Sequence, residues 1–148
     1  MSDVTLREVT RENWRACVRL TVDEAQADFV APNVYSLAES KFEPAAVPLA
    51  VYAGETMVGF VMYALEGTDG WIWRLMVDRA HQGKGYGRAA MEEVIRRLRA
   101  LPGVRRIRTS FVPANAHAAA LYRALGFHET GEVEQGEVVV ELREDAAG

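Results

Sequence analysis

The chain has 148 residues, 49% of them hydrophobic and 26% charged, a balance typical of one globular domain and unlike that of disordered chains or disulfide-rich scaffolds. Its formal net charge of −4 argues against a general nucleic-acid binder, because a phosphate backbone requires a basic protein face. The single cysteine, Cys17, excludes an intrachain disulfide and a cysteine-cluster zinc site.

The amino-terminal sequence MSDVTLREVT has neither the basic segment nor the apolar core of a signal peptide. No apolar run in the sequence approaches the roughly 20 residues that a membrane span needs. We therefore expect a cytoplasmic protein with no membrane segment.

The first third of the chain predicts one strand, one helix and a segment of irregular pattern. Residues 4–9 alternate apolar and polar side chains, as a half-buried strand does. Thr10 stands at a suitable N-cap position, so we expect a helix from there to about Val22. Residues 23–46 are interrupted by prolines, and within them only residues 36–42 favour a short helix.

The middle of the chain predicts three strands and a long helix. The strands are runs rich in β-forming residues, the first two joined by a short hairpin loop: residues 47–52, 57–65 and 71–77. From Tyr86, apolar residues recur at three- and four-residue steps, which indicates an amphipathic helix that Pro102-Gly103 ends. On its polar face, Glu92 and Glu93 each precede an arginine by four residues, the spacing of helical ion pairs.

The last part of the chain predicts a strand, a helix and a closing hairpin. After the strand at residues 105–112, Asn115 can cap a helix that runs to about Leu125 and ends at Gly126. Two strands then flank the turn Gln135-Gly136, at residues 127–134 and 137–142. The predicted order is β-α-(α)-β-β-β-α-β-α-β-β, an α/β arrangement of one domain, residues 1–148, around a mixed sheet.

A glycine-spaced turn, Gln82-Gly83-Lys84-Gly85-Tyr86-Gly87-Arg88, lies between a predicted strand and the long helix. Glycines tolerate positive φ and carry no side chain, so successive N–H groups can converge on an anion at the helix N-terminus. Lys84 and Arg88 add positive charge. The turn therefore predicts a pyrophosphate site, in preference to a turn that only reverses the chain.

Two other phosphate-binding motifs do not fit this turn. In a Walker A loop, four residues separate the first glycine from Gly-Lys-Ser/Thr, whereas here Gly85 is followed by Tyr86-Gly87. In the dinucleotide-binding fingerprint the third glycine comes one residue later than Gly87 does. Both nucleoside triphosphate and dinucleotide chemistry are therefore unsupported.

The turn and a later segment resemble the two signatures of the GCN5-related N-acetyltransferase (GNAT) superfamily. Gln82, Gly85 and Gly87 match the first, which is Gln or Arg, two residues, Gly, one residue, then Gly or Ala. The second, an Asn followed by a helix that carries Leu-Tyr and ends in Gly-Phe, is matched by residues 115–127. A more diffuse resemblance to the bacterial spermine/spermidine acetyltransferases rests on Gln26, Phe29-Val30, Ser36-Leu37-Ala38-Glu39 and Val58-Gly59-Phe60.

The resemblance implies a GNAT-type domain with a mixed, mostly antiparallel seven-stranded sheet and helices on both faces. It implies acetyl-CoA as co-substrate, no metal, and a homodimer, which is common among such proteins. By position, the strand edge would bind the pantetheine, the glycine turn the pyrophosphate, and Asn115 the pantetheine arm, with Tyr122 beside the thioester sulfur. The implied cofactor-binding residues are Leu75, Met76, Val77, Gln82, Gly83, Lys84, Gly85, Tyr86, Gly87, Arg88, Asn115 and Tyr122.

Acetyl transfer from sulfur to nitrogen requires a neutral amine, a stabilised oxyanion and a proton for the departing thiolate. The main-chain N–H of Met76 or Val77 is the candidate oxyanion donor, if the strand edge bulges away from its neighbour. Tyr122 is the candidate acid, although its position on the apolar helix face also suits a core aromatic. Asn115 is expected both to cap its helix and to bind the cofactor.

The base is not defined by a motif. Polyamine acetyltransferases often carry Asp or Glu two residues before the strand-edge pair, but here Trp73 stands at that position, followed by Arg74. Three carboxylates are possible replacements, Asp23, Glu24 and Glu66, of which Glu24 is the catalytic candidate. Four aromatic residues offer either a cation–π wall for an amine or a core or dimer interface: Phe29, Tyr63, Trp71 and Trp73.

Together these features predict an acetyl-CoA-dependent N-acetyltransferase that acts on a small primary amine. Polyamines such as spermidine or spermine are the candidate amines. The predicted mechanism is direct transfer in a ternary complex. One alternative acceptor is a protein N-terminus, a lysine or an aminoglycoside. An alternative of another class is a CoA-binding sensor without turnover, because the expected acidic residue is absent.

Overall fold

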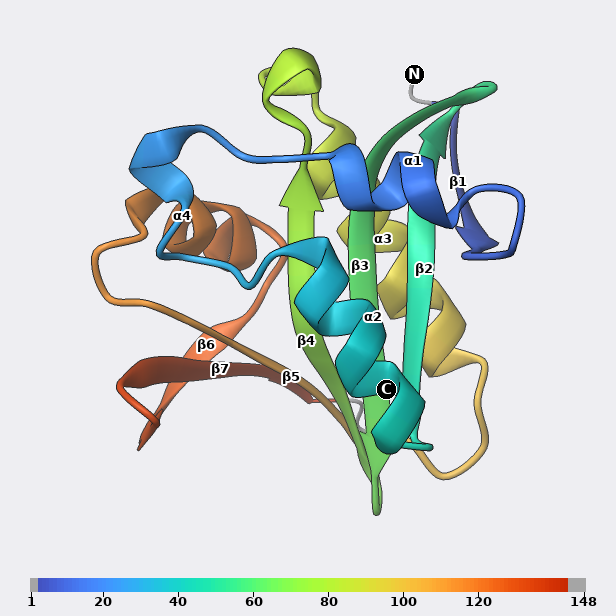
Figure 1. Cartoon of the computed structure of the whole chain (residues 1–148). Helices are drawn as coiled ribbons and strands as arrows, with labels where there is room; N and C mark the ends of the chain where they lie inside the picture. Colours follow the sequence, from blue (N-terminus) through green and yellow to red (C-terminus); the bar gives the residue numbers. More distant parts are fainter. Residues whose placement is uncertain (1–2, 144–148) are drawn as a thin grey trace.

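The computed structural model describes residues 3–143. Its helices and strands follow the predicted order (Figure 1). Their bounds are β1 (Val4–Glu8), α1 (Trp14–Arg19), η1 (Glu24–Gln26), α2 (Asn33–Phe42), β2 (Ala46–Ala53), β3 (Thr56–Glu66), β4 (Asp69–Val77), η2 (Arg79–His81), α3 (Tyr86–Arg99), β5 (Arg106–Phe111), α4 (Ala116–Ala124), β6 (His128–Glu134) and β7 (Glu137–Arg143), where η denotes a 3₁₀ helix.

The strands form one seven-stranded sheet in the order β1-β2-β3-β4-β5-β7-β6. Neighbouring strands are antiparallel except β4 and β5, which run parallel. Helices α1 and α2 cover one face and α3 and α4 the other (Figure 1). The predicted mixed, mostly antiparallel sheet with helices on both faces is confirmed.

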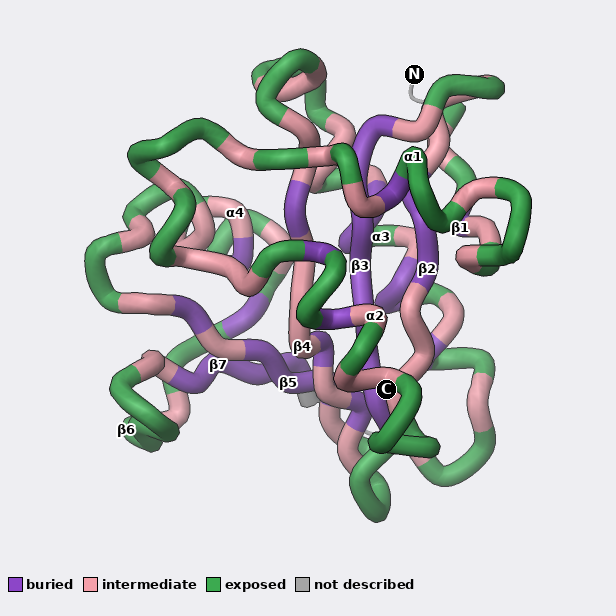
Figure 2. The backbone as a smooth tube through the Cα atoms, viewed as in Figure 1, coloured by how far each residue is buried: buried purple, intermediate pink, exposed green. Residues whose placement is uncertain are grey.

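Each face of the sheet has its own apolar core, and the central strands are the most buried part of the chain (Figure 2). The larger core lies under α3 and α4, where Met91, Val94 and Leu98 of α3 are fully buried. The smaller core lies under α1 and α2 and contains Cys17, whose thiol is fully buried. Burial raises the pKa of Cys17 to about 11, which suits a packing role.

Both ends of α1 and the start of α2 differ from the predicted positions. Helix α1 starts at Trp14 and ends at Arg19, because Thr10 opens a turn and the extended segment after Arg19 packs Leu20 and Val22 against the smaller core. Helix α2 begins at Asn33, three residues early, with the carbonyl of Pro32 accepting its first hydrogen bonds.

On α3, the expected pairs of Glu92 with Arg96 and of Glu93 with Arg97 do not form. Glu92 pairs with Arg88 and Glu93 with Arg96 instead. Arg97 donates to the main-chain carbonyl of Leu6 at 3.0 Å, because the helix lies against β1 and this carbonyl is within its reach. Contact with β1 therefore engages Arg97, which the local spacing had assigned to an ion pair on the helix surface.

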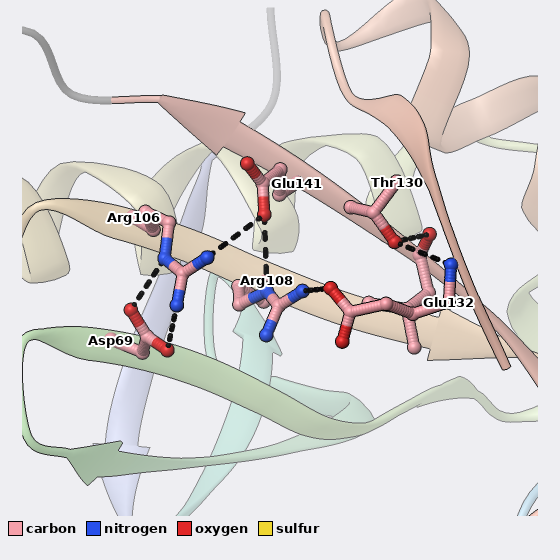
Figure 3. A network of polar contacts seen from close by, with 7 residues as sticks. Asp69, Arg106, Arg108, Thr130, Glu132 and Glu141 are labelled. Atoms are coloured by element: carbon pink, nitrogen blue, oxygen red, sulfur yellow. Dashed lines mark hydrogen bonds and ion pairs between the residues drawn. The ribbon is translucent and has the colours of Figure 1, made fainter. Parts of the chain in front are cut away.

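A network of ion pairs links the strands where β4 and β5 are paired (Figure 3). Arg106 donates two 2.9 Å hydrogen bonds to Asp69, its register partner on β4. Arg108, only 5% exposed, donates to Glu141 of β7 at 3.1 Å and pairs with Glu132 of β6. The network therefore ties four strands together at one end of the β4–β5 pair.

Candidate active site

The sheet splits between β4 and β5. The two strands are paired only where residues 69–72 face residues 106–109, and β5 then continues along β7 as far as Phe111. Thr109 Oγ1 donates to the carbonyl of Ile72 at 2.9 Å, at the point where the pairing ends. Within residues 3–143, no strand pairs with residues 73–77 on the side that faces β5, so main-chain groups of β4 are left available there.

A β-bulge on β4 decides which side chains face this split. Tyr63 of β3 is opposite Ile72 and Met62 is opposite Arg74, so Trp73 is an extra residue on β4. Side chains alternate along a regular strand, so Ile72 and Met76 would share a face. Instead, Ile72 joins the core under α3 and Met76 the core under α2. The bulge lies in the pairing with β3, three residues before Met76.

A cavity of about 800 Å³ opens at the split, a volume typical of sites for small-molecule ligands. Its walls come from β4, the 82–88 turn, β5, α4, the β6–β7 hairpin and residues 26–32, which reach across toward α4 (Figure 1). Every predicted cofactor-binding residue except Lys84 lines it: Leu75, Met76, Val77, Gln82, Gly83, Gly85, Tyr86, Gly87, Arg88, Asn115 and Tyr122. Residues from distant parts of the sequence therefore meet in one site.

The glycine turn has the backbone that an anion cradle requires. Gly83 and Gly85 have φ of 79° and 84°, and a Cβ at either position would meet no atom within 4 Å. Gly85 directly precedes the 14-residue helix α3, whose first N–H groups have no acceptor within the helix. The turn thus presents N–H groups and the positive end of a helix dipole to the cavity.

The polar side chains of the turn differ in what they contribute. Gln82 Nε2 donates to the carbonyl of Val77 and to Gln26 Oε1, both at 2.9 Å, so this side chain holds the turn against β4 and η1. Arg88 lines the cavity and pairs with Glu92 at 3.4 Å. Lys84 is exposed outside the lining of the cavity.

Tyr122 closes the inner wall of the cavity. Its ring packs against Phe111 and Phe127, with centroids 6.0 and 5.7 Å away, and 7% of the residue is exposed. Burial raises the pKa of Tyr122 to about 12, an effect that a hydrogen bond with Thr109 opposes and the charge of Glu137 reinforces. The phenol is therefore protonated at neutral pH and has a proton to donate.

Asn115 caps α4, as predicted, because its Oδ1 accepts from the N–H of Ala118 at 3.1 Å. It also lines the cavity, so its side chain lies at the helix start and beside the site at once. The cap marks the start of α4, which carries Tyr122 about two turns further along.

The carboxylates proposed as bases lie outside the cavity lining. Glu24 and Asp23 are exposed, and Glu66 is exposed and accepts a 3.3 Å hydrogen bond from Trp73 Nε1. The lining contains two other carboxylates, Asp28 and Glu137, which the sequence analysis missed. No motif marks either residue, because each reaches the site only through the fold.

The positive charge of Arg74, beside the bulge on β4, is compensated by another side chain. Arg74 lines the cavity, but its guanidinium pairs with Glu39 of α2 at 2.8 Å. Of the four aromatic residues expected near an amine, Phe29 and Trp73 line the cavity. The other two are engaged elsewhere: Tyr63 in the larger core and Trp71 under the guanidinium of Arg108.

Within residues 3–143, no helix is both long and apolar enough to cross a membrane. The same part of the chain contains no group of three or more His, Cys, Asp or Glu residues placed to hold a metal ion.

Comparison with known proteins gives a consistent family. The model of the acetyltransferase (GNAT) family matches residues 8–127. The spermine/spermidine N(1)-acetyltransferase of Bacillus subtilis strain 168 is 30% identical over 146 residues, which cover 93% of this chain and 96% of the relative. A probable spermine N(1)-acetyltransferase from Bacillus subtilis subsp. natto has the same identity and coverage.

Solved structures share the fold at lower identity. Spermidine N-acetyltransferase from Vibrio cholerae, in complex with CoA and spermine, has a TM-score of 0.74 at 18% identity and covers 94% of this chain and 93% of that one. An N-acetyltransferase from Thermoplasma acidophilum, in complex with coenzyme A, has a TM-score of 0.74 at 14% identity and covers 97% and 100%.

Proposed function

The chain belongs to the acetyltransferase (GNAT) family and is an N-acetyltransferase that uses acetyl-CoA, and we propose that it acetylates a small, cationic primary amine, polyamine-like by preference. The observation that carries this proposal is the single cavity that joins the glycine turn, the free edge of β4 and Tyr122. A phosphate site, a main-chain edge and a proton donor are the three parts that binding and cleaving a CoA thioester require.

The residues at the cavity suit coenzyme A. The N–H groups of the turn at Gly83 and Gly85 would hold the pyrophosphate, since open space lies where side chains would otherwise stand. The free main-chain groups of Leu75 to Val77 would bind the amides of pantetheine as an added strand would. Asn115 would contact the same arm, and Tyr122 would lie by the sulfur.

The proposed reaction is a direct transfer in a ternary complex. The amine nitrogen attacks the thioester carbonyl, a main-chain N–H of Met76 or Val77 stabilises the oxyanion, and Tyr122 shares its proton with the departing sulfur. Burial raises the pKa of Tyr122 to about 12. Complete transfer of its proton to a thiolate with a reference pKa near 8.5 would therefore cost about 5 kcal/mol, so partial transfer at the transition state is the useful contribution.

A cationic acceptor is supported by the carboxylates of the cavity lining. Asp28 and Glu137 line the cavity, while Glu39 compensates Arg74. Phe29 and Trp73 offer aromatic surface for an ammonium group or an aliphatic chain. The names of the curated relatives, spermine and spermidine acetyltransferases, point to the same class of substrate.

The test is a substrate panel with acetyl-CoA and spermidine, spermine, a lysine peptide and an aminoglycoside, read as free thiol released. Cys17 is fully buried and does not add to this signal in the native protein. We expect calorimetry to detect CoA binding and the polyamines to have the highest kcat/KM. A protein that binds CoA yet releases none with any amine would be a sensor.

Tyr122→Phe separates the acid role from simple packing. The ring stays in place, so we expect the dissociation constant of CoA to change less than twofold while kcat falls about 100-fold, as for loss of one general acid. Equal kcat in the variant and the parent would contradict the role of Tyr122.

A homodimer and a cytoplasmic location are also proposed. Tyr35 and Phe42 on the outer side of α2 are 58% and 78% exposed, an apolar surface that a second copy would cover. Sedimentation velocity at micromolar concentration checks the mass, and fractionation of the source cells checks the location.

A further inference from the structure

Glu137, in the β6–β7 hairpin, lines the cavity and accepts a hydrogen bond from another side chain. It is the first residue of β7, and its Oε1 accepts a 2.8 Å hydrogen bond from Ser110 Oγ of β5. Phe111 and Val138, the neighbours of these two residues in sequence, pack in the core under α3 and α4. Because side chains alternate, Ser110 and Glu137 lie on the opposite face of the sheet.

This arrangement places Glu137 and Tyr122 on opposite sides of the split. Tyr122 enters the cavity from the α4 face, among aromatic residues of the larger core. Glu137 enters it from the face that α1, α2 and the 26–32 segment cover. A thioester in the split would thus have a proton donor on one side and a carboxylate on the other, where an amine would approach.

The remaining contacts of Glu137 leave it free to receive a cation. Among the described residues, Ser110 is its hydrogen-bond partner and no Lys, Arg or His pairs with it. Asp28, the other carboxylate of the lining, is exposed in a turn, and no side-chain hydrogen bond to it is seen among the described residues. The other titratable or charged side chains that line the cavity are Arg74, His81, Tyr86, Arg88, His117 and Tyr122.

We propose that Glu137 is a catalytic residue that binds the acceptor amine and removes its proton, an inference that rests on the proposed function. An incoming ammonium gives one proton to Glu137, which returns it to solvent, and the neutral nitrogen attacks the thioester carbon. As the N–C bond forms and the C–S bond breaks, the nitrogen loses a second proton through Glu137. The sulfur takes the proton of Tyr122, which solvent replaces.

The electrostatics of the site agree with this pairing of roles. Burial is the main cause of the raised pKa of Tyr122, and the negative charge of Glu137 is the smallest of the causes and acts in the same direction. The two groups are therefore near enough to interact. Ser110 acts as a positioning residue, since its hydroxyl fixes one carboxylate oxygen and leaves the other for the amine.

The test compares Glu137→Gln with Glu134→Gln. Glu134 is the cross-strand partner of Glu137 at the hairpin, is exposed and does not line the cavity, so it is a matched control for the loss of one charge. Glutamine at 137 still accepts the bond from Ser110, which preserves the fold. With spermidine at pH 7.5, we expect kcat/KM to fall about 100-fold or more for E137Q and less than twofold for E134Q.

Two further readouts separate proton removal from a structural role. Between pH 7.5 and 9.5 the neutral fraction of an amine with pKa near 10.4 rises roughly 100-fold, so the deficit of E137Q should shrink markedly. The CoA dissociation constant of E137Q should stay within twofold of the parent. A deficit that is constant with pH, or a loss of CoA binding, overturns the inference.

Failure of this inference and failure of the proposed function are distinguishable. The parent must first bind CoA and acetylate spermidine, which tests the function alone. If the parent is active and E137Q retains kcat/KM within threefold, Glu137 is not the base. If D28N rather than E137Q loses activity with the predicted pH dependence, the loop carboxylate has the role and the inference is wrong.

Discussion

Arg74 Nη2 donates a 2.8 Å hydrogen bond to Glu39 Oε1 and so joins β4 to α2 at the edge of the cavity. The two side chains are 20% and 29% exposed, and the pair therefore retains part of its strength against solvent screening. The bulge at Trp73 explains this contact, because it turns Arg74 toward the α2 face. The positive charge of Arg74 at the cavity is thereby compensated.

Glu39→Gln should release this positive charge at the amine end. We expect KM for spermidine to rise about 3- to 10-fold, roughly 1 kcal/mol of repulsion, with kcat and CoA affinity almost unchanged. Glu43→Gln is the matched control, since Glu43 is exposed at the end of the same helix. A KM that moves equally in both variants would show that Arg74 has no influence on the acceptor.

Gly85→Ala should impair cofactor binding beyond its cost in stability. Alanine at a φ of 84° is strained by about 1 kcal/mol, and its Cβ would project into the space proposed for the pyrophosphate. Gly103→Ala is the control, because Gly103 has a φ of 88°, equally open surroundings and no place in the cavity lining.

We expect both glycine variants to lose similar amounts of stability in urea titrations. Only G85A should raise the CoA dissociation constant, by 10-fold or more in calorimetry. If G103A weakens CoA binding to the same extent, the turn is not the phosphate site.

High pH should destabilise the fold partly through Tyr122. Its pKa is about 12 in the native protein against 10.0 for the free side chain, so between these values the unfolded chain releases a proton that the native state keeps. This contribution to the free energy of unfolding is fully present below pH 10. It is lost as pH rises toward 12, and the total loss is about 3 kcal/mol. Urea midpoints at pH 9, 10 and 11 should therefore fall less steeply for Tyr122→Phe than for the parent.

The two glutamates of the β4–β5 junction should differ in their importance for stability. Glu141 is 7% exposed between Arg108 and Arg106, whereas the side chain of Glu132 is 49% exposed. Glu141→Gln removes the charge that compensates the buried Arg108 and should lower the free energy of unfolding by about 3 kcal/mol. Glu132→Gln should cost less than about 1 kcal/mol. Equal losses in denaturant titrations would contradict this ranking.

Features that depend on local chemistry were predicted well. The glycine turn and the amphipathic period identified the start of α3, and Asn115 identified the start of α4, because caps and left-handed turns depend on a few adjacent residues. The boundaries of α1 and the start of α2 were predicted poorly. There, contacts with the smaller core and the carbonyl of Pro32 decide where helical hydrogen bonding begins and ends.

The sequence by itself therefore determined the family, the cofactor and the order of helices and strands along the chain, since each is encoded in short motifs or in periodicity. Only the tertiary structure decided which carboxylates line the cavity. Ser110 and Glu137 are 27 residues apart and become neighbours because β5 and β7 pair, while Glu24 remains outside the cavity lining. Pairing between distant strands depends on how the whole sheet packs, and no local signal carries that information.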